Sequence, residues 1–168
     1  MAAQGQKKRL ALDANVLFDL AAEKDFAHTF REVYQERGYS LWVPPTVVQE
    51  LSYYVHEKVC RESKLAFQAL AQMRRWHLIP YDLKSVGHGI TEQFARRLIR
   101  VGLLPEGEFN DGLILAETAL ASIPVLVTSD GDLLNIDAIA LRVQLEEADF
   151  PPVQVFHPKP LLKALAPK

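Results

Sequence analysis

RLALDANVLFDL, which spans Arg9–Leu20, joins a run of apolar residues directly to an acidic one. The apolar run Leu10–Leu12 follows three basic residues and predicts a short buried strand. It ends at Asp13, after which apolar residues return at helical spacing. In open parallel α/β sheets, ligands bind beyond the carboxyl ends of the strands, so Asp13 stands where chemistry is normally done. Aspartate is also a preferred N-cap, and helix capping explains Asp13 alone equally well.

The composition is that of one globular domain. The chain has 168 residues, of which 49% are hydrophobic and 24% are charged, which is sufficient for a sizeable core. We expect a single domain over residues 1–168, with residues 1–8 flexible. The formal charge of −2 excludes a protein coated with basic residues but leaves room for a local basic groove. The single cysteine, Cys60, cannot form an internal disulfide, and we expect it to pack in a helix.

The sequence also bears on location. The amino-terminal residues contain no apolar signal core, and no apolar run approaches the roughly 18 residues that a membrane span requires. We therefore expect a cytoplasmic protein without membrane contact.

Strand-like and helical segments alternate along the rest of the chain. Further strands are predicted at Ser40–Val43, Trp76–Tyr81, Pro124–Val127 and Val153–Phe156. Helices are predicted at Ala27–Arg37, as a hairpin over Thr46–Arg75, at Thr91–Val101, from Asp111 to about Ser122, over Leu133–Glu147 and at Pro158–Leu165. This alternation predicts a parallel sheet with helices on both faces.

Helix starts are predicted from residues that cap helices. Asp25 and Asn110 are suitable N-caps, and Thr46 followed by Gln49 matches a capping box. The segment from Ser85 to Gly89 is expected to be a loop that precedes the helix at Thr91.

Four acidic residues have equivalent places in this arrangement. Asp13 and Asp130 follow two predicted strands, whereas Glu50 and Asp111 lie in the first turn of two predicted helices. Strand ends and the helix starts that follow them meet at one edge of a parallel sheet, so all four carboxylates are expected to face one cleft. Each acid taken alone is explained as a cap or a helix-dipole partner, but their joint placement is harder to dismiss.

Acidic residues gathered in one cleft repel each other unless a cation neutralises them. The five histidines are scattered, so the sequence shows no zinc-like ligand spacing. Oxygen ligands suit Mg²⁺ or Mn²⁺, which commonly act on phosphate substrates. Because the sequence also lacks a Walker-type glycine loop and a GxGxxG motif, metal-assisted hydrolysis of a phosphodiester is the remaining candidate.

Four segments together resemble the PIN-domain family of metal-dependent ribonucleases. These are LDANVLFDL around Asp13, VVQEL around Glu50, NDGLILAETA around Asp111 and LVTSDGDLL around Asp130. They follow the family order and span most of the chain from Arg9 to Leu134. The resemblance implies an α/β fold, a three-layer α/β/α sandwich with a mainly parallel central sheet.

The resemblance also implies a function and its residues. It implies an endoribonuclease that cleaves single-stranded RNA, with catalysis and Mg²⁺ or Mn²⁺ binding by Asp13, Glu50, Asp111 and Asp130. Asp132 matches a further, variable metal-binding acid, and Asn15 and Thr128 match polar positions that support the acidic cluster. The family includes VapC-like toxins and RNA-processing enzymes, so a toxin role with an antitoxin partner, and a homodimer, are left open.

Arg96, Arg97 and Arg100 form the densest basic stretch of the sequence. Arg96 and Arg100 fall on one helical face, where they can contact the RNA backbone. A solvated helix face or a subunit contact explains this stretch equally well.

Other protein classes fit this sequence less well than the nuclease. A haloacid-dehalogenase-like phosphatase needs a second acid two residues after the first, where this chain has Asn15. A receiver-type signalling domain needs adjacent acids near the first strand and a late lysine after a strand, and neither is present. The main competitor is a catalytically silent domain of the same fold that binds RNA or a protein partner, which a turnover assay with Mn²⁺ distinguishes from the nuclease.

Overall fold

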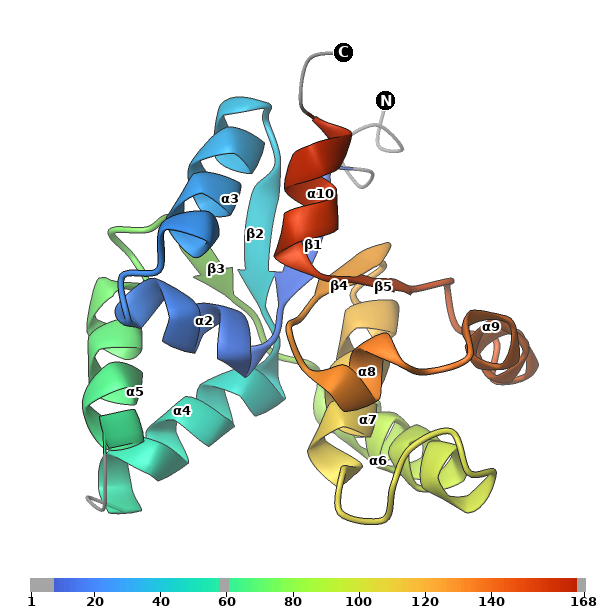
Figure 1. Ribbon diagram of the computed structural model, residues 1–168. Helices are drawn as coiled ribbons and strands as arrows, with labels where there is room; N and C mark the ends of the chain where they lie inside the picture. The colour runs from blue at the N-terminus through green and yellow to red at the C-terminus, as the bar shows by residue number, and fades with distance from the viewer. Residues whose placement is uncertain (1–7, 58–60, 166–168) are drawn as a thin grey trace.

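The computed structural model describes residues 8–57 and 61–165 (Figure 1). Within these ranges, one parallel sheet of five strands has the order β3-β2-β1-β4-β5. The strands are β1 (Arg9–Leu12), β2 (Ser40–Val43), β3 (Leu78–Pro80), β4 (Val125–Val127) and β5 (Gln154–Phe156). In chain order, β2 and β3 extend the sheet on one side of β1, and β4 and β5 then extend it on the other side. Such a reversal creates a switch point between β1 and β4, where ligands bind in open α/β sheets.

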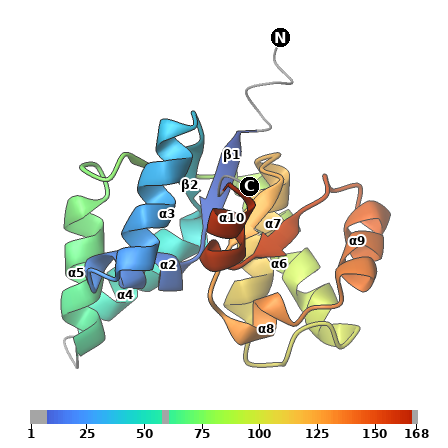
Figure 2. The same cartoon turned by 45° about the horizontal axis from the view of Figure 1, so that its top comes forward.

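Helices cover both faces of the sheet, as the alternating pattern predicts. Figure 1 shows α2 (Ala14–Ala21), α3 (Asp25–Glu36) and α10 (Pro158–Ala164) in front of the sheet, with α6 (Ser85–Arg100) and α7 (Phe109–Leu120) behind it. The remaining helices are α4 (Pro45–Glu57), α5 (Arg61–Gln72), α8 (Gly131–Leu134) and α9 (Ala138–Glu147). The hairpin of α4 and α5 lies on one side of the molecule and α9 on the opposite side (Figure 2). The three-layer α/β/α sandwich is confirmed.

The central strand β1 places the first acid. Leu10–Leu12 is fully enclosed, because β1 pairs with β2 on one side and with β4 on the other. The ladder continues for one residue beyond the strands: the backbone N–H of Asp13 donates to Val127 at 2.9 Å, and that of Thr128 donates to Phe156 at 2.9 Å. Asp13 and Thr128 are therefore fixed side by side at the carboxyl edge of the sheet.

The predicted starts of α3 and α4 are wrong in detail. Asp25 is the first residue of α3 rather than its N-cap. The helix α4 begins at Pro45, a residue favoured in the first turn, so Thr46 lies inside the helix. Thr46 donates its hydroxyl and its backbone N–H to the buried carboxylate of Glu117 in α7, at 2.7 and 3.0 Å, and this long-range contact replaces the predicted capping box with Gln49.

The starts of α6 and α7 also differ from the prediction. The helix α6 begins at Ser85, so the expected loop is helical, and Thr91 is a buried residue in its interior. The helix α7 begins at Phe109, which makes Asn110 its second residue and Asp111 its third. Asn110 is not a cap, because its side-chain amide is used in a contact with α4 that is described below.

Two further expectations concern the carboxyl-terminal part of the chain and the residues outside the described ranges. The single helix predicted over Leu133–Glu147 is divided into α8 and α9, and Asp137 caps α9 by accepting from the backbone N–H of Ala140 at 2.9 Å. Cys60 and residues 1–7 lie outside the described residues. No helix within the described ranges is both long and apolar enough to cross a bilayer.

Candidate active site

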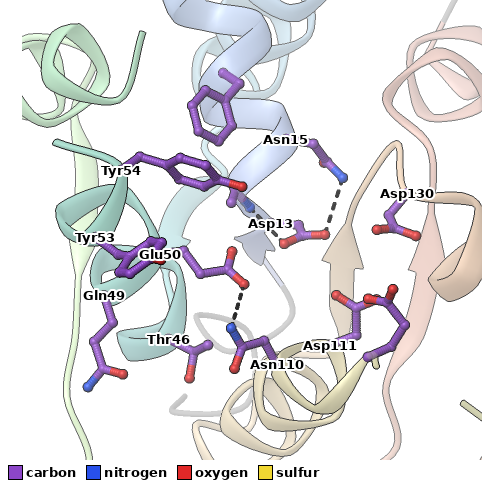
Figure 3. Close-up of a pocket in the computed structure, with 13 residues that line it drawn as sticks. Asp13, Asn15, Thr46, Gln49, Glu50, Tyr53, Tyr54, Asn110, Asp111 and Asp130 are labelled. Atoms are coloured by element: carbon purple, nitrogen blue, oxygen red, sulfur yellow. Dashed lines mark hydrogen bonds between the residues drawn. The ribbon is translucent and has the colours of Figure 1, made fainter. Parts of the chain in front are cut away.

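A cavity of about 720 Å³ opens at the carboxyl edge of the sheet, over the switch point (Figure 3). The structure brings the four predicted acids together there: its lining includes Asp13, Glu50, Asp111 and Asp130. In Figure 3, Glu50 of α4 lies on one side of Asp13, whereas Asp111 of α7 and Asp130 lie on the other. The convergence arises because these acids follow parallel strands or lie near the starts of helices that cross at this edge.

Asp13 is the most buried of the four predicted acids and is only 3% exposed. One carboxylate oxygen accepts from the backbone N–H of Ala14 at 2.7 Å, which makes Asp13 the N-cap of α2. The other oxygen accepts from the Thr128 hydroxyl at 2.7 Å and from the Asn15 amide at 3.3 Å. Burial raises the pKa of Asp13, and the hydrogen bonds from Thr128 and Ala14 lower it only in part. Asp13 therefore caps a helix and also lines the cavity.

Asn15 and Thr128, the two polar residues predicted to support the acids, join the loop after β4 to the end of β1. The Asn15 amide donates to the Thr128 hydroxyl at 3.1 Å, and the Asn15 carbonyl accepts from the backbone N–H of Ser129 at 3.1 Å. The backbone N–H of Asp130 also donates to the Thr128 hydroxyl, at 2.9 Å. This network holds the loop that carries Asp130 against the residues that carry Asp13.

Glu50 faces the cluster from α4. It lies in the second turn of the helix rather than in the predicted first turn, because α4 begins at Pro45. Its carboxylate accepts from the side-chain amide of Asn110 at 3.0 Å (Figure 3). Burial raises the pKa of Glu50 to about 7, with a further contribution from the negative charge of Asp13. The contact with Asn110 therefore joins α4 to α7 across the cavity and sets the position of Glu50.

The closest group of carboxylates consists of Glu108, Asp111 and Asp130. One oxygen from each lies within 4.8 Å of the others. Asp111 is 6% exposed, and within the described part of the chain its buried Oδ2 atom has no hydrogen-bond partner. Burial, followed by the charges of Asp13 and Asp130, raises the pKa of Asp111 to about 8. Hard divalent cations prefer such oxygen ligands, so these residues fit a Mg²⁺ or Mn²⁺ ion.

Glu108 was missed in the sequence. It lies between the helices predicted at Thr91–Val101 and from Asp111, and it becomes the residue before α7 only because that helix begins at Phe109. The available signal was its spacing of three residues from Asp111, which places two side chains on the same side of a helical turn.

Asp132 lies differently from the four acids. It is exposed in the first turn of α8, and it is not among the described residues that line the cavity. Its backbone N–H donates to Asp130 at 2.7 Å, which makes Asp130 the N-cap of α8. Asp132 therefore helps to fix Asp130 through its main chain.

The three arginines line a different hollow, of about 500 Å³, beside Ala148 and Phe150. The guanidinium of Arg97 forms a salt bridge with Glu147 and donates to the Gln144 side chain at 2.7 Å, which joins α6 to α9. Arg96 lies 4.0 Å from Glu92 in an exposed pair, and Arg100 is exposed. The structure thus leaves Arg96 and Arg100 accessible to a ligand and uses Arg97 in a contact between helices.

The PIN domain model matches residues 10–139 of the chain, which include all four acids. A chain in the crystal structure of VapBC2 from Rickettsia felis, bound to a DNA fragment from its promoter, has a similar fold with a TM-score of 0.58 and 15% identity. That similarity covers 88% of the present chain and 98% of the other. A comparison with curated protein sequences gives no significant match. The family model covers well over half of the sequence, and the chain belongs to the PIN-domain family.

Proposed function

We propose that this protein is a metal-dependent endoribonuclease that hydrolyses phosphodiester bonds of single-stranded RNA with Mg²⁺ or Mn²⁺. PIN domains are in general nucleases and use divalent metal ions. The observation that carries the proposal is the buried Oδ2 atom of Asp111, which lacks a partner and lies among carboxylates within 4.8 Å of one another. An uncompensated cluster of this kind costs free energy, and a bound cation removes that cost.

The ion would be held by Glu108, Asp111 and Asp130, with Asp13 and Glu50 facing the same space. When bound, a divalent ion activates water for attack on phosphorus and offsets the negative charge of the transition state. The protein residues supply orientation: Thr128 and Asn15 fix the carboxylate of Asp13, and Asn110 fixes that of Glu50. These carboxylates are therefore already held in position before a phosphate enters the cavity.

We extend the proposal to a toxin role with an antitoxin partner, in analogy to the VapBC2 complex from Rickettsia felis. The support is the fold, which covers 98% of the compared chain. Because fold alone does not specify a partner, co-expression with the product of a neighbouring gene is the direct test of this extension.

Substitution of Asp13 by asparagine tests metal dependence. Asp13→Asn preserves size and can still cap α2, but it removes one charge from the cluster. We expect titration calorimetry to show Mn²⁺ binding at least about 10-fold weaker, and cleavage of single-stranded RNA about 100-fold slower, because charge stabilisation in the transition state is lost.

Asp137→Asn is the matched control, because Asp137 is also an N-cap aspartate but lies on α9, outside the cavity lining. The control should bind Mn²⁺ and cleave RNA like the wild type. Equal Mn²⁺ binding by Asp13→Asn and the wild type would contradict the assigned site. Normal Mn²⁺ binding by the wild type without RNA turnover would instead favour a catalytically silent binding module.

Arg100 is expected to contact phosphates rather than bases. It is exposed beside the arginine-lined hollow, and a phosphate contact releases counterions regardless of sequence. Arg100→Ala should weaken binding similarly for unrelated RNA sequences and reduce the salt slope of log affinity by about one. Arg142→Ala, which removes an exposed arginine from α9, is the control. Equal salt slopes for both variants would assign Arg100 to solvent or to a protein contact.

A further inference from the structure

One wall of the acidic cavity is aromatic. Phe18, Tyr53 and Tyr54 are part of the cavity lining together with the acids. Figure 3 shows Tyr53 and Tyr54 on the same side of the cavity as Glu50. Glu50, Tyr53 and Tyr54 lie on α4 at positions i, i+3 and i+4, which share one face of a helix. The helix that supplies an acid therefore also supplies the adjacent aromatic wall.

The rings of this aromatic wall support each other and leave Tyr53 open. Tyr54 meets Phe18 of α2 edge to face, with ring centroids 5.5 Å apart and planes at 85°. Tyr53 lies 6.0 Å from Tyr54 with planes at 72°. Tyr53 is 61% exposed, whereas Tyr54 is 37% exposed. The contact with Phe18 thus fixes Tyr54, and Tyr54 in turn supports a tyrosine that presents most of its ring to the cavity and solvent.

The charges of the cavity indicate that this wall contacts the bases of a nucleic acid rather than its phosphates. The described residues that line it include Asp13, Glu50, Glu108, Asp111 and Asp130, but no lysine or arginine. Because these walls carry no basic side chains, they do not attract the phosphates of a nucleic acid. Only a bound cation would do so. Stacking on an aromatic ring is the remaining strong contact, and every nucleobase has a π-face that can make it.

We infer that the wall formed by Phe18, Tyr53 and Tyr54 binds an unpaired nucleobase beside the phosphate that enters the acidic cluster, with Tyr53 as the stacking residue. This inference rests on the proposed nuclease function and adds a substrate-binding subsite to it. In a duplex, both faces of a base are covered by its neighbours, so a subsite of this kind selects single strands. Gln49, exposed one turn before Tyr53 and also in the lining, is positioned to contact the edge of the stacked base.

Two RNA-like strands of equal charge test this inference. One is a single-stranded RNA of mixed sequence, and the other is an abasic ribose-phosphate strand of the same length; both carry an end label for fluorescence anisotropy. Binding is measured with Ca²⁺, which oxygen ligands also hold, and cleavage of the base-containing strand is measured separately with Mn²⁺. Tyr53→Ala should bind the base-containing strand about 5- to 100-fold more weakly, as expected for one lost stacking contact, and should bind the abasic strand like the wild type.

Two variants serve as controls. Tyr53→Phe keeps the ring and loses only the hydroxyl, so its affinity should stay within about twofold of the wild type if stacking is the contact. Phe67→Ala removes a ring of matched exposure, 62%, from α5, outside the cavity lining, and should leave binding and cleavage unchanged. A kinetic experiment should show the loss in Tyr53→Ala mainly as a raised KM, because the ring binds substrate without touching the reacting atoms.

The outcomes separate this inference from the proposed function. Normal cleavage with equal binding of the base-containing strand by wild type, Tyr53→Ala and Phe67→Ala would overturn the subsite, leave the nuclease standing and make the wall available to a protein partner. Base-dependent binding through Tyr53 without cleavage would support the subsite and contradict the nuclease. Absence of binding to either strand by the wild type would overturn both.

Discussion

Replacement of Asp111 by asparagine is expected to stabilise the metal-free protein and at the same time remove most of its RNA cleavage. Asp111 is 6% exposed, and its Oδ2 atom has no hydrogen-bond partner among the described residues. Asparagine has nearly the same shape but does not ionise. It therefore removes the cost of keeping a carboxyl group in a buried place beside Asp13 and Asp130, whether that group is charged or has to take up a proton. The loss of a favourable helix-dipole interaction, worth about 0.3–1 kcal/mol, opposes this gain only weakly.

The raised pKa of Asp111 makes the stability of the metal-free protein depend on pH. The pKa of Asp111 rises from 3.8 to about 8, because of burial first and of the charges of Asp13 and Asp130 next. The folded protein therefore retains a proton that the unfolded chain releases near pH 4. The stability that this proton contributes is complete below about pH 4 and is lost as the pH rises towards 8. The raised pKa of Glu50, about 7, acts in the same direction over a slightly narrower range.

Thermal unfolding without metal should therefore show a melting temperature that falls between pH 5 and pH 8 in the wild type and falls less in Asp111→Asn. Added Mn²⁺ should raise the melting temperature of the wild type more than that of the variant, because a ligand stabilises only the state that binds it. Cleavage by the variant should drop by about 100-fold or more. A variant that is less stable without metal but cleaves normally would show that Asp111 acts only at the start of α7.

The sequence allowed the edge of the sheet to be predicted well, for a definite physical reason. Asp13 follows the apolar run Leu10–Leu12 of β1, and such a run has one stable position, buried between neighbours in a parallel sheet. Asp130 comes three residues after Val127, the last residue of the buried strand β4, so its position along the chain also fixes its position in space. The sequence pattern therefore predicts the position of a residue well when that residue directly follows a buried strand.

The helix-borne parts of the site were less predictable. Asn110 is a good N-cap by composition, but its amide contacts Glu50, a residue 60 positions away. Thr46 is similarly engaged by Glu117, 71 positions away. These contacts depend on how α4 crosses α7, and no local pattern records that crossing. Glu108 lies in the acidic cluster because α7 begins at Phe109, and Tyr53 lies in the aromatic wall because α4 packs beside α2. Neither arrangement is recorded in the local sequence pattern.

Gly112, the residue after Asp111, is expected to be the most sensitive backbone position in the site. The helices α6 and α7 approach so closely that a Cβ atom at Gly112 would lie 2.8 Å from the Cβ and 2.9 Å from the Cα of Ala95. Contacts this short force the helices apart, because the Cα atom of Ala95 belongs to the backbone and cannot rotate away. Gly112→Ala should destabilise the protein by about 1–3 kcal/mol, which lowers the melting temperature by roughly 2–12 °C.

The same substitution at Gly89 separates this packing effect from helix propensity. Gly89 lies in α6 and is exposed, and a Cβ atom added there would meet nothing within 4 Å beyond the local backbone of its own helix. Gly89→Ala should therefore gain about 0.5–1 kcal/mol from reduced backbone entropy. Because α7 carries Asp111, the displacement in Gly112→Ala should also weaken Mn²⁺ binding below the new melting temperature, whereas Gly89→Ala should bind Mn²⁺ normally. Equal stabilisation by both substitutions would mean that α6 and α7 are not in close contact at Gly112, and the placement of Asp111 opposite Glu50 would then need another cause.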